Sequence, residues 1–208
     1  MPQLSQAKTL GGIGSILMIL SFVPAVGWLL AIAGAVMVLV AIKYISEIVQ
    51  DNSIFNNMLL AIVLGIVGLV IGVVVILGTV LATFGLGAIS GWFSSGVPGF
   101  ATPPTVPTGG FISLILGAIA GLAIIWVLLL VSAIFMRRSY STISQKLGVG
   151  MFGTTGLLYL IGAALTIVVV GVIVLFVALI LNIVAFFSIP DQLNTQPAPQ
   201  QPTQPATM

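Results

Sequence analysis

The chain has 208 residues, of which 60% are hydrophobic and only 4% are charged, against roughly 25% charged residues in soluble proteins, so its composition excludes a soluble globular domain. Five basic and three acidic side chains give a net charge of +2, and they are too few for the clustered basic face that binds nucleic acid. Cysteine and histidine are absent, which excludes disulfides, thiolate nucleophiles and the usual transition-metal ligands.

The longest apolar run indicates that the chain crosses a bilayer several times. No charged residue lies between Lys146 and Asp191, and one helix through these roughly 44 positions would be about 66 Å long. A bilayer core is only about 30 Å thick. We therefore predict an all-α polytopic transmembrane bundle with about six spans, at residues 9–23, 26–42, 54–85, 111–136, 147–160 and 165–187.

Short tails flank this bundle, and the first two spans form a predicted hairpin. Residues 1–8 are an N-terminal tail, and residues 189–208 are a Pro/Gln-rich tail that is expected to be disordered. Gly11 and Gly14 thin the first span for a close helix contact, and Pro24 marks the turn. A cleaved signal peptide is the alternative for the first apolar stretch. The second apolar run follows at once, however, and this suits a hairpin better.

The segment after the second span carries most of the acidic residues. Lys43, Glu47 and Asp51 are spaced four residues apart and would form one polar stripe if the helix continued. We interpret them as a helix end that reaches water; a paired acidic site for a metal or for catalysis is the alternative. Residues 51–53 predict a turn and an N-cap for the third span.

Paired glycines indicate close packing of the third and fourth spans. Gly68 and Gly72 form one GxxxG pair, and Gly117 and Gly121 form another; such pairs let helices approach closely in lipid. The connection at 85–110 is uncharged and rich in Gly, Ser, Thr and Pro. We predict an exposed or interfacial loop there, long enough to cap a cavity or meet a partner.

The remaining boundaries rest on charge and on small residues. Arg137 and Arg138 are expected to end the fourth span at residue 136. The last two spans should reverse near residues 162–164, where Gly and Ala tolerate a tight turn.

The positive charges predict the orientation of the bundle. With six spans, both termini and every basic residue lie on one side, and the positive-inside rule makes that side cytoplasmic, with the chain in the cell membrane. The residues concerned are Lys8, Lys43, Arg137, Arg138 and Lys146. A weak echo between residues 44–55 and 140–152 leaves open a duplication into two three-helix halves.

Several stretches resemble a known family. They are KTLGGIG at 8–14, KYISE at 43–47 with Ile54 and Phe55, GLLYLIGAAL at 156–165 and AFFSIP at 185–190. They are similar to the DUF996 family of archaeal and bacterial multi-pass membrane proteins, whose function is uncharacterised. The resemblance covers about residues 8–190, without motif residues in the 85–110 loop. It implies a membrane protein and brings no catalytic residue, cofactor or metal.

The residues themselves also assign no chemistry, and we expect no enzymatic activity. The spans hold no carboxylate or histidine for an intramembrane protease or for proton coupling. The first remaining hypothesis is a structural or interaction bundle in the lipid bilayer, as a homo-oligomer or with a membrane-protein partner and without nucleic acid. The alternative is a passive channel or small-solute transporter.

The polar residues of the spans separate these two hypotheses. A polar path would use Ser15, Thr154, Thr166 and Asn182. If these residues face one shared cavity, transport is favoured. If they face helix backbones across dry contacts, the structural role is favoured.

Overall fold

A computed structural model describes residues 4–21, 23–24, 26–84, 108–168 and 170–190. These residues form six α-helices, one 3₁₀ helix and no strand: α1 (Leu4–Leu20), α2 (Gly27–Ile48), α3 (Asn52–Phe84), α5 (Thr108–Leu147), α6 (Gly150–Leu165), η1 (Thr166–Val168) and α7 (Val170–Phe187). α2, α3, α5, α7 and the continuous segment of α6 and η1 are each long and apolar enough to cross a membrane, whereas α1 is shorter. The fold is therefore the predicted polytopic helical bundle. Most of the predicted 85–110 loop and of the C-terminal tail lies outside the described residues.

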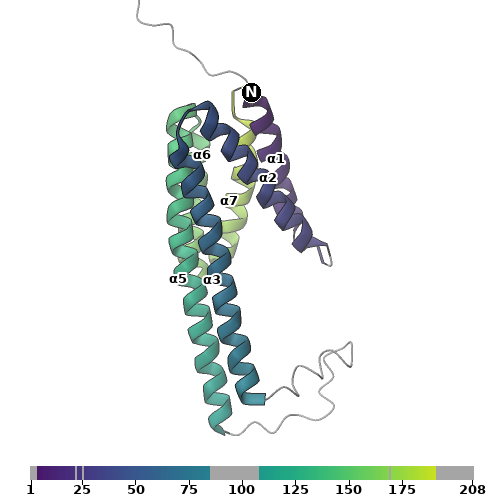
Figure 1. Cartoon of the computed structure of the whole chain (residues 1–208), viewed down its shortest axis with the longest axis vertical. Coiled ribbons are helices and arrows are strands. Elements are labelled where there is room, and N and C mark those ends of the chain that lie inside the picture. Colours follow the sequence, from purple (N-terminus) through teal and green to yellow (C-terminus); the bar gives the residue numbers. More distant parts are fainter. Residues whose placement is uncertain (1–3, 22, 25, 85–107, 169, 191–208) are drawn as a thin grey trace, which may run out of the picture.

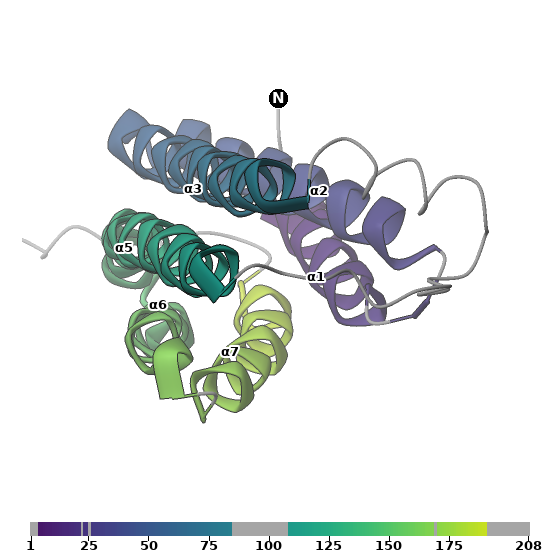
Figure 2. The same cartoon turned by 90° about the horizontal axis from the view of Figure 1, so that it is seen from below.

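The helices form a ring. Each helix packs against the next one along the chain, and α7 returns to pack against α1 (Figures 1 and 2). The most extensive contact joins α3 and α5, which the suggested duplication would assign to different halves. These two helices form a long antiparallel hairpin that projects beyond the other four (Figure 1).

One end of the ring carries all the charged side chains of the described residues. Both ends of the described chain and the α2–α3 and α5–α6 connections lie there (Figure 1). We call it the charged end, and its charged residues are Lys8, Lys43, Glu47, Asp51, Arg137, Arg138 and Lys146. The opposite end of the α3–α5 hairpin is called the far end.

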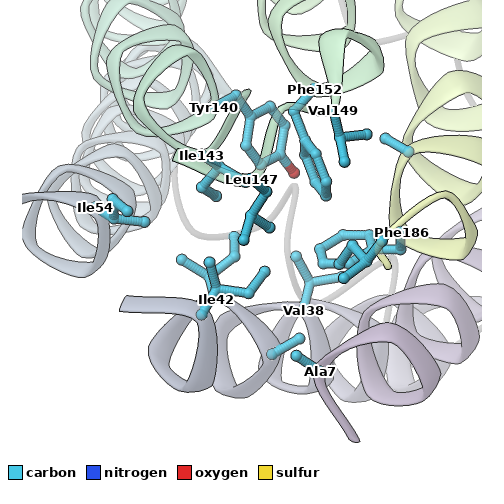
Figure 3. Close-up of a cluster of buried hydrophobic side chains, with 14 of the residues drawn as sticks. Ala7, Val38, Ile42, Ile54, Tyr140, Ile143, Leu147, Val149, Phe152 and Phe186 are labelled. Atoms are coloured by element: carbon cyan, nitrogen blue, oxygen red, sulfur yellow. The ribbon is translucent and has the colours of Figure 1, made fainter. Parts of the chain in front are cut away.

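The main hydrophobic core also lies near the charged end, and all six helices contribute to it (Figure 3). Its centre is aromatic: the rings of Tyr140 and Phe152 are 5.7 Å apart, and those of Phe152 and Phe186 are 5.2 Å apart and nearly perpendicular. Edge-to-face pairs of this kind stabilise a core beyond the area they bury. The core therefore joins α5, α6 and α7 to the N-terminal helices.

The charged residues do not end the helix on which they lie. α5 continues through Arg137 and Arg138 to Leu147, beyond the apolar span that the two arginines are predicted to end at residue 136. They end only its apolar part. Arginine is a good helix former, and the fully buried Tyr140 and Ile143 hold the extension against the core.

The reversal between the last two long helices also lies later than predicted. α6 continues through residues 162–164 to Leu165, and the chain turns at Thr166–Val168. The small residues serve close packing instead, because a Cβ atom at Gly162 would lie 2.8 Å from the side chain of Leu175 on α7.

Paired glycines let α3 and α5 approach each other along the hairpin. A Cβ atom at Gly72 would lie 2.9 Å from the carbonyl oxygen of Gly121, and the same distance separates a Cβ atom at Gly121 from the carbonyl oxygen of Gly72. Gly68 faces Leu128 in the same way, and Gly117 faces Thr79.

Two serines of α5 fix the register of this hairpin nearer the charged end. The hydroxyl group of Ser132 donates to the carbonyl oxygen of Ala61 at 2.6 Å, and that of Ser139 donates to the carbonyl oxygen of Ile54 at 2.8 Å. A carbonyl oxygen has two lone pairs, so these bonds add to those within α3.

We expect Gly72→Ala to destabilise the protein in detergent by about 1–3 kcal/mol, because the added methyl group overpacks the contact with α5. Gly78→Ala on the same helix is the matched control, since a Cβ atom there has no neighbour within 4 Å. Thermal unfolding of the two variants measures the difference. Equal midpoints would contradict a close contact at Gly72.

Candidate functional site

A buried polar contact joins the first and last helices of the described chain. Nδ2 of Asn182 on α7 donates to Oγ of Ser15 on α1 at 2.9 Å, and the Ser15 hydroxyl donates to the carbonyl oxygen of Gly11 at 2.7 Å. Both side chains are at most 1% exposed. Oδ1 of Asn182 has no hydrogen-bond partner among the described residues. The Tyr140 hydroxyl group lies beside this amide.

Glycines make room for this contact on α1. A Cβ atom at Gly11 would overlap the ring of Phe186 on α7, and one at Gly14 would lie 2.8 Å from the carbonyl oxygen of Gly34 on α2. Because these two positions are glycines, α1 can approach both α7 and α2 closely. This is a buried, closely packed environment.

The structure does not bring the predicted polar path together in one cavity. The hydroxyl groups of Thr154 and Thr166 donate to carbonyl oxygens of their own helix, those of Gly150 and Gly162. Neither threonine is buried, whereas Ser15 and Asn182 are. None of the four residues lines any of the three hollows described below.

The charged residues after the second span divide into two ion pairs. Nζ of Lys43 lies 4.0 Å from Oε1 of Glu47 within α2, and Nζ of Lys146 lies 3.9 Å from Oδ2 of Asp51. α2 ends at Ile48, so Asp51 does not extend a helical stripe. No group of three or more metal-ligating side chains occurs among the described residues.

Asp51 caps α3, as predicted. Its Oδ1 accepts hydrogen bonds from the backbone N–H of Ser53 at 3.1 Å and from the Ser53 hydroxyl at 2.6 Å. These hydrogen bonds, with a smaller contribution from the charge of Lys146, lower the pKa of Asp51 below its usual value. The carboxylate therefore fixes the start of α3 and links it to the end of α5.

A basic hollow, which the sequence did not reveal, lies on the outer face of α5 near the charged end. It encloses about 600 Å³ and is lined by Asn57, Ile134, Arg137, Arg138, Ser141, Thr142 and Leu160. From the sequence, the two arginines are assigned to the end of the fourth span and to orientation. A signal was present, since Ser141 and Thr142 each follow an arginine by four residues and so share its helical face.

Two further hollows are present. One encloses about 530 Å³ near the far end of the hairpin, where Thr79, Thr83 and Ser113 line it. The threonine hydroxyl groups there donate to carbonyl oxygens of α3 itself. The other encloses about 450 Å³ beside Ser5, Gln6 and Tyr44.

Comparison with known proteins gives one family and no activity. A family model described as "Protein of unknown function (DUF996)" matches residues 30–180. An uncharacterised protein of Methanocaldococcus jannaschii is 36% identical over 194 residues, which covers 93% of this chain and 97% of that protein. No solved structure matches the chain.

The buried pair predicts an asymmetric mutational response. Ser15→Ala should cost about 1–3 kcal/mol, because it leaves the Asn182 amide group buried without its acceptor. Adding Asn182→Leu should recover part of this loss, since it removes the unpaired amide group. Thermal unfolding in detergent of both single variants and the double variant tests this. A double variant less stable than Ser15→Ala would contradict it.

The lowered pKa of Asp51 predicts acid sensitivity. A carboxylate with a depressed pKa adds stability above its usual pKa and loses this contribution as pH falls through the lowered value. Between about pH 7 and about pH 3, the thermal midpoint should fall more for the wild-type protein than for Asp51→Asn, whose amide group caps a helix without titrating. Equal falls would show that other carboxyl groups dominate.

Proposed function

The chain belongs to the DUF996 family of proteins of unknown function, and we propose that it is a structural or interaction protein of the membrane, either a homo-oligomer or a subunit of a larger membrane complex. The observation that carries this proposal is the buried hydrogen bond of Ser15 with Asn182, which joins α1 to α7. The Ser15 hydroxyl and the Asn182 amide, which could otherwise bind a solute, instead bond to each other and join two helices. No catalytic step or cofactor is assigned.

The length of the α3–α5 hairpin also supports an interaction role. α3 has 33 residues and is about 50 Å long, whereas α6 and α7 have 16 and 18 residues and are about 24 and 27 Å long. Only the shorter helices match a bilayer core of about 30 Å. Without strong tilt, the far end of the hairpin extends past the hydrocarbon region, and a protein partner would remove its apolar surface from water.

The exposed apolar side chains of this hairpin are numerous. Near the far end they include Val74, Leu77, Ile112, Leu116 and Ile119. Patches of this size on a protein mark contact with lipid or with another protein. α3 and α5 also bury the smallest share of their apolar sequence among the five long apolar helices.

A flux measurement separates this proposal from a passive channel or transporter. We expect purified protein in proteoliposomes to show no flux of ions or small solutes above protein-free liposomes. The Thr166→Val, Asn182→Leu double variant should behave identically. Flux that the double variant loses would overturn the structural role and place a path at the C-terminal helices.

Site-directed crosslinking tests the interaction role directly. The natural chain has no cysteine, so a single cysteine can carry a photocrosslinker in native membranes. Leu116→Cys on the hairpin should give one discrete product, a second copy or a membrane protein. Ile173→Cys on α7 is the matched control, because Leu116 and Ile173 are 62% and 66% exposed. Equal, diffuse products at both positions would contradict a partner on the hairpin.

We also propose that the protein lies in the cell membrane with both termini in the cytoplasm, because the described basic residues gather at one end. Arg137→Glu with Arg138→Glu should disturb this orientation, as seen by a reporter fused at the C-terminus. Arg137→Lys with Arg138→Lys keeps the charge and should keep the orientation. An unchanged reporter signal in the glutamate variant would show that the lysines suffice.

A further inference from the structure

The basic hollow on α5 is built from three helices. α5 lies between α3 and α6 (Figure 2), and the hollow takes Asn57 from α3 and Leu160 from α6 as its two walls. Its floor is the outward face of α5, where Arg137 and Arg138 stand one turn from Ser141 and Thr142. Residues far apart in the sequence therefore converge on one surface.

The hollow is positively charged and offers hydrogen-bond donors that the fold does not use. No carboxylate lines it, and within the described chain neither arginine takes part in an ion pair. The side chains of Asn57 and Ser141 likewise make no hydrogen bond to a described residue. The guanidinium group of Arg138 lies 5.6 Å from the ring centroid of Phe135, a cation–π contact that holds it in place.

These donors suit a phosphate group. Guanidinium groups match the geometry of phosphate oxygens and bind them through charge-assisted hydrogen bonds. A hydroxyl and an amide group beside them add neutral donors. The Thr142 hydroxyl is not among them, because it donates to the carbonyl oxygen of Arg138.

The position of the hollow indicates what carries the phosphate. Arg137 and Arg138 stand where the apolar part of α5 ends, which places them at the level of lipid headgroups. Ile134 precedes the arginines by about one turn on the side of α5 away from the charged end, and Ser141 and Thr142 follow them toward that end. On α6, Leu160 lies one turn farther from the charged end than Gly156, which packs against Arg137. This gradient matches an amphiphile whose headgroup sits at the interface and whose chains point inward.

We propose that this hollow binds the phosphate group of an anionic phospholipid, with Arg137, Arg138, Ser141 and Asn57 as its ligands. Basic pockets between transmembrane helices bind anionic headgroups in this way. The bound lipid would bridge α3, α5 and α6 at the charged end. This site is independent of the structural role proposed above.

Lipid titration of the purified full-length protein in detergent tests the site. Dioleoylphosphatidylglycerol is the anionic probe, dioleoylphosphatidylcholine is the zwitterionic control, and native mass spectrometry counts the lipids retained. We expect saturable binding of the anionic lipid and at least about tenfold weaker binding by the Arg137→Gln, Arg138→Gln variant, since hydrogen bonds to charged groups are lost. Equal retention of the two lipids by the wild-type protein would overturn the proposal.

Two further double variants distinguish a specific site from a general effect of surface charge. Lys43→Gln with Lys146→Gln removes the same charge at the same end but outside the hollow, and it should bind the anionic lipid as the wild type does. Asn57→Ala with Ser141→Ala keeps both arginines and should weaken binding several-fold. Equal weakening by the lysine and arginine variants would reduce the effect to surface charge and overturn the site.

Competition with inorganic phosphate identifies the source of the phosphate group. The lipid assignment predicts that inorganic phosphate displaces phosphatidylglycerol only weakly, because it lacks the chains that contact Ile134 and Leu160. Displacement at equal concentration would assign the hollow to a soluble phosphate compound and overturn the lipid assignment.

Discussion

The packing of α7 against α1 is the contact on which the rest of this structure depends. It closes the row of helices into a ring, and the Asn182–Ser15 hydrogen bond lies buried within it. In the membrane, water does not replace a broken hydrogen bond between two buried polar side chains. The pair therefore favours the one register of α1 and α7 in which the bond forms over shifted registers. Apolar packing alone specifies register weakly, because most faces of these helices are interchangeable. The glycines of α1 make the contact possible by letting the backbones approach.

This closure divides the molecule into two unlike ends. At the charged end six helices share one core with an aromatic centre, and two ion pairs and the Asp51 cap of α3 lie there. At the far end only α3 and α5 remain, and they hold each other through paired glycines. Such a division suits a protein whose anchored end fixes orientation and whose projecting hairpin meets a neighbour. The basic hollow forms beside α5, which like α3 extends from the charged end to the far end.

The sequence predicted some helix boundaries of this protein and not others. Apolar runs and turn residues indicated six helices, although α1 begins at Leu4, within the predicted N-terminal tail, because Leu4 and Ala7 pack in the core. The cap at residues 51–53 was predicted because its chemistry is local. The full length of α5 was not predicted, because an arginine stops an apolar run without stopping a helix, and only the burial of Tyr140 and Ile143 shows that the helix continues. The turn after α6 was misplaced because Gly162 serves close packing with Leu175. A small residue permits either a tight turn or close helix packing, and the sequence alone does not distinguish the two.

By itself the sequence determined that the chain is a multi-pass helical membrane protein, because the hydrophobic effect and the thickness of the bilayer act on composition and length. It also determined that the basic residues described would gather at one end. Only the tertiary structure decided which polar groups meet: it paired Asn182 with Ser15, kept Thr154 and Thr166 apart from them, and set Asn57 beside two arginines. These outcomes depend on how helices rotate about their axes. In apolar helices that rotation is fixed by packing with partners distant in the chain.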